Sequence, residues 1–189
     1  EHYADRVATS RALGELGLDA GRFFLATLHR AENVDERGRL GRLLEGLSAV
    51  ADAWAEPMIV SVHPRTAERL AGWGLGPASS RVRLVDPLGF FDFVALEKTA
   101  RCVLSDSGTV QEECAIFGQP SVTLRDVTER PETIEAGSNI LSGASPDDIL
   151  RATRLALDRP PRWIAPGGYR QPEVSTTVTK IVLGFSDLV

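Results

Sequence analysis

The 189-residue sequence predicts a doubly wound α/β domain built on a mainly parallel β-sheet. Short apolar runs alternate with longer amphipathic segments along the chain, and this alternation is typical of βαβ units. Each run is followed by polar residues, and these polar clusters are marked by His29, His63, Asp86, Ser107 and Arg125. Because parallel strands end at the same edge of their sheet, we expect the clusters to share the edge where such sheets bind ligands.

Length and charge limit the class of protein. With 43% hydrophobic residues the chain can bury a substantial core, and we expect a single domain over residues 1–189. The net charge of -5 argues against nucleic acid or an anionic membrane as partner. No apolar run approaches the roughly 20 residues that span a bilayer. No signal peptide is recognisable, although the sequence begins with Glu1 rather than Met.

Cysteine and lysine usage adds two expectations. Cys102 and Cys114 are the only cysteines, and we expect both to be buried, reduced and structural, as in a cytoplasmic protein. Lys98 and Lys180 are the only lysines, and this bias towards arginine fits a GC-rich bacterial genome.

The first part of the chain predicts a helix, a strand and a longer helix. Residues 2–18 have helical apolar spacing, with Gly17 near the end. Residues 23–28 form an apolar run typical of a fully buried parallel strand. Residues 38–54 predict a long helix with an apolar face made of Leu40, Leu43, Leu44, Leu47 and Val50.

A second strand and its helix follow. The strand is predicted over residues 58–62, and Pro64 suits the first turn of a helix that continues through Leu70. Residues 72–77 predict a loop, in which we expect Trp73 to pack against the protein.

A third strand is predicted over residues 83–85, and the helix after it opens with three phenylalanines. We expect two of the three to lie in the core. The three phenylalanines are Phe90, Phe91 and Phe93.

The segment from residue 102 to residue 132 carries the strongest functional signal. It predicts a strand, a tight turn, a helix, a further strand and a loop that leads into another helix. These occupy residues 102–104, 105–109, 110–117, 121–124 and 125–132.

The tight turn predicts an anion site. Ser107 or Thr109 can cap the helix, whose first N–H groups and dipole attract negative charge. Glu112 and Glu113 lie just inside the helix and suit the hydroxyls of a sugar.

Two arginines complete this rim. Arg125 and Arg130 follow the next strand, and a planar guanidinium fork is the natural partner of a diphosphate. Hydroxyls, carboxylates and guanidiniums on one rim predict a nucleotide-sugar pocket.

The end of the chain predicts one more strand and two helices. The strand covers residues 138–141, and Ser145-Pro146 opens a helix that runs to about Arg159 and is stopped by Pro160-Pro161. Residues 162–172 predict a loop, and residues 174–183 a final helix.

Three motifs carry a resemblance to a known family. D-S-G-T-V-Q-E-E at 106–113 and R-D-V-T-E-R-P-E at 125–132 closely resemble motifs of the non-hydrolysing UDP-N-acetylglucosamine 2-epimerases. T-L-H-R-A-E-N at 27–33 resembles the T-x-H-R-x-E-N signature of the same family. Thr109 departs from the commonest form, which has a second glycine there, and could mark a subgroup with a modified sugar. The resemblance implies the carboxyl-terminal, Rossmann-like half of a two-domain glycosyltransferase-B-type fold.

The resemblance also implies roles for individual residues around the diphosphate. His29 would be the catalytic residue and, with Arg130, would contact the diphosphate region. Ser107, Gly108 and Thr109 would line that region.

Further roles concern the nucleoside and regulation. Glu113 would hold the ribose and Phe93 would lie near the uracil ring. Arg30 and His63 match positions that serve a second, activating UDP-N-acetylglucosamine in some bacterial members, and they are candidate regulatory residues.

The implied reaction is epimerisation of UDP-N-acetylglucosamine at C2, by elimination and re-addition of UDP. The family's proton-transferring carboxylates belong to the other domain, which is not in this sequence. We expect UDP-N-acetylglucosamine or a related UDP-amino sugar as ligand, and a homodimer for the full-length protein. Neither a G-x-G-x-x-G motif after the first strand nor metal-ligand spacing is present, so we expect no dinucleotide cofactor and no metal.

Two other interpretations remain open. A glycosyltransferase of the same fold would share the ribose and diphosphate contacts, but not the T-x-H-R-x-E-N and T-E-R-P-E motifs together. The second interpretation is a non-catalytic domain that binds UDP-sugars.

Overall fold

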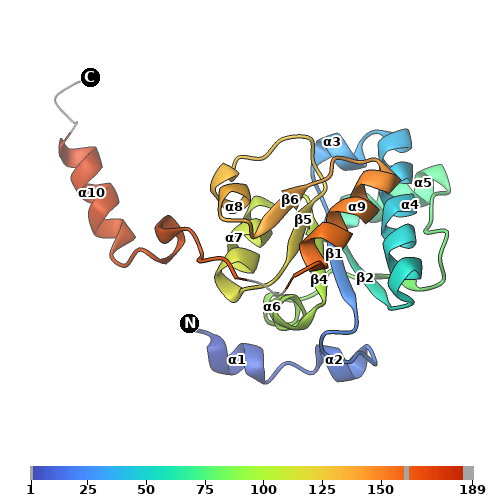
Figure 1. The fold of residues 1–189 in the computed structure, drawn as a ribbon, viewed down its shortest axis with the longest axis horizontal. Coiled ribbons are helices and arrows are strands. Elements are labelled where there is room, and N and C mark those ends of the chain that lie inside the picture. Colours follow the sequence, from blue (N-terminus) through green and yellow to red (C-terminus); the bar gives the residue numbers. More distant parts are fainter. Residues whose placement is uncertain (1, 160–161, 185–189) are drawn as a thin grey trace.

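The computed structural model describes residues 2–159 and 162–184, which form a six-stranded sheet in the order β3-β2-β1-β4-β5-β6 (Figure 1). All neighbouring strands pair in parallel, which confirms the predicted doubly wound class. The strands are β1 (Phe24–Leu28), β2 (Met58–Val62), β3 (Val82–Val85), β4 (Cys102–Ser105), β5 (Ser121–Thr123) and β6 (Asn139–Leu141).

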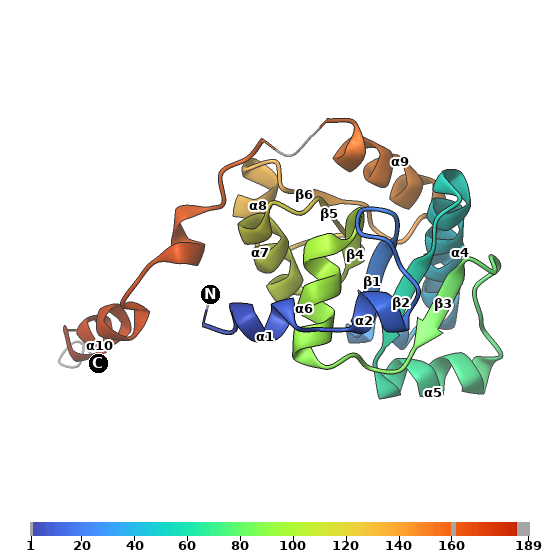
Figure 2. The ribbon, with the colours of Figure 1, turned by 90° about the horizontal axis from the view of Figure 1, so that it is seen from below.

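Helices connect the strands and cover both faces of the sheet (Figure 2). Within the described ranges, none of them is long and apolar enough to cross a membrane. They are α1 (Ala4–Ala8), α2 (Ala12–Glu15), α3 (Ala31–Val34), α4 (Arg37–Trp54), α5 (Pro64–Trp73), α6 (Phe90–Thr99), α7 (Gly108–Phe117), α8 (Pro131–Glu135), α9 (Pro146–Leu157), the 3-10 helix η1 (Gly167–Arg170) and α10 (Val174–Gly184).

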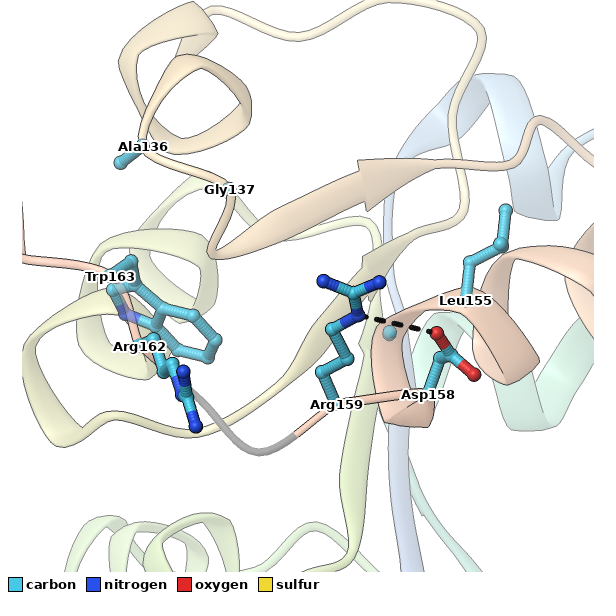
Figure 3. Close-up of a pocket in the computed structure, with 8 residues that line it drawn as sticks. Ala136, Gly137, Leu155, Asp158, Arg159, Arg162 and Trp163 are labelled. Carbon is cyan, nitrogen blue, oxygen red and sulfur yellow. Dashed lines mark ion pairs between the residues drawn. The ribbon is translucent and has the colours of Figure 1, made fainter.

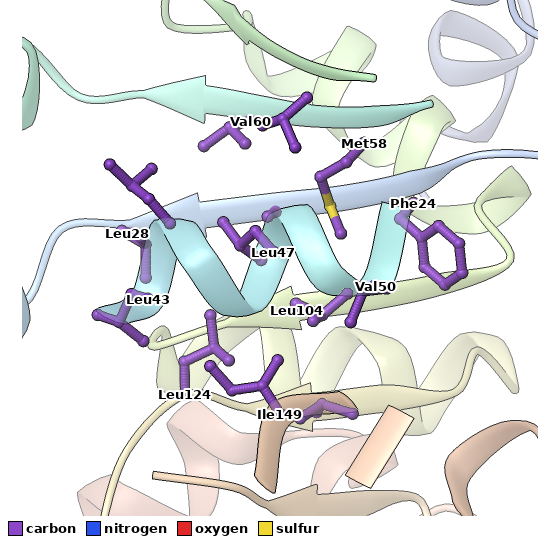
Figure 4. Packing of buried hydrophobic residues seen from close by; sticks show 14 of the residues in the cluster. Phe24, Leu28, Leu43, Leu47, Val50, Met58, Val60, Leu104, Leu124 and Ile149 are labelled. Atoms are coloured by element: carbon purple, nitrogen blue, oxygen red, sulfur yellow. The ribbon is translucent and has the colours of Figure 1, made fainter. Parts of the chain in front are cut away.

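The larger core lies between the sheet and helices α4, α5 and α9. Leu43, Leu47 and Val50 of α4 point towards the strands, as predicted for the apolar face of this helix (Figure 4). They meet side chains from β1, β2, β4 and the end of β5, together with Ile149 of α9. Leu43, Leu47 and Val50 are fully buried.

The second core lies on the opposite face, under α2, α6 and α7. Its strand residues alternate with those of the first core, so that Leu25 faces one side and Phe24 the other. Cys102 and Cys114 are both buried free thiols, as predicted, and each belongs to one of the two cores.

The strand order creates a switch point between β1 and β4. These two strands are neighbours, although the chain visits β2 and β3 before it returns to β4. The connections therefore leave β1 and β4 in opposite directions, and a crevice opens at their carboxyl ends. The polar clusters after Leu28 and Ser105 meet at this crevice.

The predicted helix over residues 2–18 is wrong, because α1 and α2 are separate helices. Thr9 donates to the backbone carbonyl of Arg6, and Ser10 donates to Asp92 at 2.6 Å. The Ser10 hydroxyl also accepts from the backbone N–H of Ala12. Hydroxyl side chains compete with helical hydrogen bonds in this way, and here they end one helix and begin the next.

The prediction that two of the three phenylalanines lie in the core is also wrong. Phe90 is 59% exposed, whereas Phe91 and Phe93 are only partly buried. Phe91 packs edge-on against Tyr3, which precedes α1, and Phe93 packs against the second core. Trp73 does pack against the first core, but it ends α5 instead of lying in a loop.

Three predictions concern the carboxyl-terminal part. The final helix is confirmed as α10, which lies apart from the sheet in both views (Figures 1 and 2). The helix predicted from Ser145 is confirmed as α9, with Pro146 at its first position. The stop predicted at Pro160-Pro161 lies outside the described residues.

The contact between α4 and α9 generates a stability prediction. A side-chain carbon at Gly46 would lie 2.5 Å from Cδ1 of Ile149 and 3.3 Å from the backbone of Pro146. Gly46→Ala should therefore lower the free energy of unfolding by about 1–3 kcal/mol in urea titrations. Gly41 lies in the same helix with open space around it, so Gly41→Ala should raise it by about 0.5–1 kcal/mol. Equal effects would show that α9 does not pack on Gly46.

Candidate functional site

A buried carboxylate, that of Asp106, lies at the switch point between β1 and β4. The residue follows β4 and is 0% exposed. Its oxygens accept from the backbone N–H of His29 at 3.1 Å and from that of Arg30 at 3.0 Å. The side-chain amide of Asn33 donates to the same carboxylate at 3.0 Å. Asp106 thus ties the segment after β1 to the end of β4.

These hydrogen bonds keep Asp106 ionised. Burial alone would raise the pKa of its carboxyl, but donors from His29, Asn33 and Arg30 outweigh burial and lower the pKa. Nδ1 of His29 lies 2.9 Å from Oδ1 of Asp106. A carboxylate beside Nδ1 holds the ring proton there and leaves Nε2 for a ligand.

Two guanidiniums converge on the first residue of α7. A side-chain carbon at Gly108 would lie 3.8 Å from Nη2 of Arg130 and 4.0 Å from Nη2 of Arg30. The first N–H groups of α7 are at the same place, with the positive end of the helix dipole. This geometry is suited to an anion with several oxygens.

The predicted capping by Ser107 or Thr109 is wrong. Ser107 takes the N-cap position, yet makes no side-chain capping hydrogen bond within the described part of the chain. Its backbone N–H donates to the hydroxyl of Ser105 at 3.0 Å, and α7 begins at Gly108. Thr109 is exposed in the first turn. The amino end of α7 is therefore open to a ligand.

Acidic partners hold Arg130. Its Nε pairs with Oε1 of Glu112, and its Nη1 donates to the backbone carbonyl of Glu129 at 3.0 Å. The side chain of Arg130 is 35% exposed, so part of the fork faces solvent. Glu112, which is predicted to contact a sugar, pairs with this guanidinium.

Arg125 does not present the free fork that the sequence predicts. Its side chain is 4% exposed, and Nε donates to Glu32 at 2.7 Å. The other two nitrogens donate to Glu129 at 2.6 and 2.9 Å. Hydrogen bonds from Arg125 lower the pKa of Glu129 to about 2. Arg125 therefore braces the loop after β5 instead of facing a ligand.

A cavity of about 250 Å³ opens beside this cluster, at the carboxyl ends of β1, β2 and β4. It brings together four of the predicted site residues: His29, His63, Phe93 and Ser107. Thr27, Ser61 and Pro87 complete its lining.

Glu113 lies in a different hollow. It is half-buried in a cavity of about 480 Å³ between α1, α6 and α7, with Tyr3, Phe90 and Lys98. Glu113 and Phe93, both predicted to contact a nucleoside, therefore line separate cavities, and α6 contributes to each.

A third hollow, of about 440 Å³, lies near the opposite edge of the sheet (Figure 3). It is lined by Gly137, which precedes β6, by the end of α9 and by Trp163. Its Arg159 pairs with Asp158 at 3.8 Å. None of the predicted site residues lines it.

Two buried acids were not predicted as site residues. One is Asp106, whose position after a strand and before a Ser-Gly turn was the available signal. The other is Glu97 of α6, which is 0% exposed and accepts from the thiol of Cys114 at 3.3 Å. Its Oε2 is buried without a hydrogen-bond partner among the described residues. No metal-like group of three His, Cys, Asp or Glu occurs in residues 2–159 and 162–184.

Comparisons with known proteins agree with the resemblance that the three sequence motifs carry. Residues 1–182 match the family model described as UDP-N-acetylglucosamine 2-epimerase. A UDP-N-acetylglucosamine 2-epimerase of Methanocaldococcus jannaschii is 42% identical over 149 residues, which cover 77% of this chain and 41% of that protein. A UDP-2,3-diacetamido-2,3-dideoxy-D-glucuronate 2-epimerase of Pseudomonas aeruginosa is 39% identical over 150 residues, which cover 79% of this chain and 41% of that protein.

Solved structures agree with these sequence matches. The crystal structure of the M. jannaschii UDP-GlcNAc 2-epimerase in complex with UDP-GlcNAc and UDP has a TM-score of 0.85 and 33% identity, and the match covers 96% of this chain and 51% of that one. The fold is thus one half of the glycosyltransferase-B type, as predicted. The chain spans about half or less of the length of these relatives.

The buried Glu97 generates a prediction for pH dependence. Burial, and then the charge of Glu113, outweigh the hydrogen bond from Cys114 and raise the pKa of Glu97 from 4.5 to about 8. Between these values the unfolded chain releases a proton that the folded chain keeps, so stability falls as pH rises through this window and levels off above it.

Glutamine has no such proton to lose. Relative to the parent, Glu97→Gln should therefore gain on the order of 2–4 kcal/mol in free energy of unfolding between pH 5 and pH 8. Urea titrations at both pH values measure this difference. Glu68→Gln, an exposed change on α5, serves as control. Parallel pH profiles for the parent and Glu97→Gln would contradict the prediction.

Proposed function

The chain belongs to the UDP-N-acetylglucosamine 2-epimerase family, and we propose that it is the UDP-binding half of an enzyme that epimerises UDP-N-acetylglucosamine at C2. The observation that carries this proposal is the convergence of Arg30 and Arg130 on Gly108, at the amino end of α7. A diphosphate carries adjacent negative charges and many acceptor oxygens, which two forks and a helix amino end can bind together.

The leaving group explains why this cluster suits the reaction. Elimination removes the C2 proton, breaks the bond between C1 and the diphosphate oxygen, and leaves negative charge on UDP. Donors fixed before the reaction stabilise that charge most effectively. Arg130, held by Glu112, supplies one such fork and Arg30 a second, with Ser107, Gly108 and Thr109 around the phosphates.

His29 is the proposed catalytic residue of this half. Asp106 binds Nδ1 and fixes the orientation of the ring, so that Nε2 can face the oxygen on which charge develops. In the reverse step, UDP adds again to C1 while a proton returns to C2 on the other face.

The base that takes the C2 proton is proposed to lie outside this chain. Two acids beside the guanidiniums of the site are paired with arginines: Glu112 with Arg130, and Glu129 with Arg125. Asp106 is buried and accepts hydrogen bonds from His29, Arg30 and Asn33. An arginine partner lowers the basicity of a carboxylate, as the low pKa of Glu129 illustrates. This supports a catalytic cleft shared with a second domain.

The remaining proposed contacts concern the nucleoside and regulation. Phe93 lies near the uracil and Glu113 binds the ribose, so the nucleoside reaches from one side of α6 towards the other. Arg30 and His63 remain the proposed contacts of a second, activating UDP-N-acetylglucosamine. Because His63 lines the same cavity as His29, that ligand would touch the first one.

We further propose that residues 1–189 form one UDP-sugar-binding domain of a cytoplasmic, bacterial, homodimeric enzyme. The ligand could be a modified UDP-amino sugar. The P. aeruginosa relative is named for such a sugar, and Thr109 adds a hydroxyl where the commonest motif has glycine.

Two measurements test this function. Calorimetry should show that the chain binds UDP, and NMR of the full-length protein with UDP-N-acetylglucosamine in D2O should show deuterium at C2 of the manno epimer. The chain alone should bind without turnover. Turnover by residues 1–189 alone would locate the base within this chain, and a failure to bind UDP would refute the proposal.

The fork of Arg130 generates a separate prediction. Arg130→Lys should weaken UDP binding nearly as much as Arg130→Ala, by about 1.5–3 kcal/mol, because a lysine cannot keep the contact with Glu112 and reach the phosphate as well. Calorimetry measures the UDP affinity of both Arg130 variants. Arg151→Ala on α9 is the control, because it removes the same charge from a side chain that is 72% exposed. Parental affinity in the lysine variant would show that charge alone suffices.

A further inference from the structure

The backbone of Arg130 is anchored on both sides by threonine hydroxyls. Its N–H donates to Oγ1 of Thr128 at 3.0 Å, and its carbonyl accepts from Oγ1 of Thr133 at 2.8 Å. Thr133 is 0% exposed, whereas nearby residues of the loop after β5, such as Val127 at 64%, are open to solvent. These two hydroxyls therefore fix the point from which the guanidinium extends.

Both anchors are connected to one buried amide, that of Asn139 in β6. The hydroxyl of Thr128 donates onward to Oε1 of Gln111 at 2.7 Å. Nδ2 of Asn139 donates to this same oxygen and to Oγ1 of Thr133, at 3.3 Å in each case. Gln111 is 1% exposed and Asn139 is 2% exposed. These hydrogen bonds form a closed ring that connects the Asn139 amide to the backbone N–H and the backbone carbonyl of Arg130.

The neighbouring strand fixes the orientation of the Asn139 amide. Oδ1 accepts from Oγ1 of Thr123 at 2.9 Å and from Oγ of Ser121 at 3.3 Å, both in β5. The Ser121 hydroxyl is shared with the carbonyl of Ser138 at 3.2 Å, so Thr123 is the main donor that holds the oxygen, and the amide turns its N–H groups towards α7 and α8. A buried network in which each member is satisfied is rigid and specifies one arrangement.

We propose that Asn139 is a positioning residue for the anion site, which sets the place of Arg130 through Gln111, Thr128 and Thr133. This inference rests on the proposed function, because it assigns Arg130 to the diphosphate. Asn139 lies outside the three motifs that resemble the family, and it does not line the cavity beside His29. Its effect on a ligand would pass through Arg130.

Asn139→Asp removes the donors of this amide and adds a carboxylate, whose direct effect on UDP the double-mutant cycle below separates. The carboxylate keeps the acceptor for Thr123 and Ser121 but loses the N–H groups that reach Gln111 and Thr133. We expect about tenfold weaker UDP binding by calorimetry, from the loss of two buried hydrogen bonds. Uridine, which has no phosphate, should bind the variant and the parent equally in NMR titrations.

A double-mutant cycle with Arg130→Ala separates positioning from general destabilisation. If Asn139 acts through Arg130, Asn139→Asp should change UDP affinity less than about twofold once Arg130 is alanine. Ser48→Ala is the stability control, because it removes a buried hydroxyl that donates to Leu44, on the helix that covers the other core. That control should leave UDP affinity unchanged.

Hydrogen exchange supplies a readout that needs no ligand. The amide of Arg130 should exchange faster in Asn139→Asp than in the parent, whereas amides of β1 should not. If Asn139→Asp does not fold, Thr133→Val removes one anchor with little change of shape and should give the same two results, and Thr133→Ser should restore them.

Each outcome decides a different point. A parent chain that fails to bind UDP refutes the proposed function, and this inference with it. If the parent binds, three results overturn the inference while the function stands: unchanged affinity in Asn139→Asp, equal losses for UDP and uridine, or a full additional loss in the Arg130→Ala background.

Discussion

The rest of the site depends on the hydrogen bonds that Asp106 accepts from the segment after β1. The carboxylate of Asp106 has no exposure to water, yet it receives donors from His29, Arg30 and Asn33. Breaking such a buried network would leave several polar groups without partners, which costs far more than any one bond contributes. The crevice between β1 and β4 therefore has one stable arrangement, with His29 and Arg30 on the same rim as the start of α7.

Ion pairs decide which arginine of this rim can face a ligand. Arg125 is buried between Glu32 and Glu129 and serves as a brace. Arg130 shares its fork between Glu112 and the open side of the site. A chain with a net charge of -5 can thus present a locally cationic rim, since its acids hold the arginines in place without covering Gly108. An anion would be attracted by the local arrangement and not by the protein as a whole.

The sequence predicted features that depend on local pattern. Apolar runs located all six strands of the described residues within about two residues, since a buried parallel strand has a continuous apolar signature. Motifs indicated His29 and Arg130, which remain proposed site residues. Neither pattern nor motif could show that Glu32 and Glu129 pair with Arg125, or that Asn139 is linked to Arg130 by hydrogen bonds. Those contacts join residues far apart in the chain, such as Arg125 and Glu32, separated by 93 positions. The break at Ser10 was missed because its partner, Asp92, is distant too.

The most direct test of the account is the affinity of Asp106→Asn for UDP, measured by calorimetry beside its melting temperature. The amide keeps the size of the side chain but turns an N–H group towards the backbone N–H groups of His29 and Arg30. The backbone of His29 and Arg30 should therefore shift. UDP should bind Asp106→Asn at least about tenfold more weakly, and the variant should still fold. Asp147→Asn, an exposed change on α9, should have no effect. Parental affinity in folded Asp106→Asn would contradict the central role of this carboxylate.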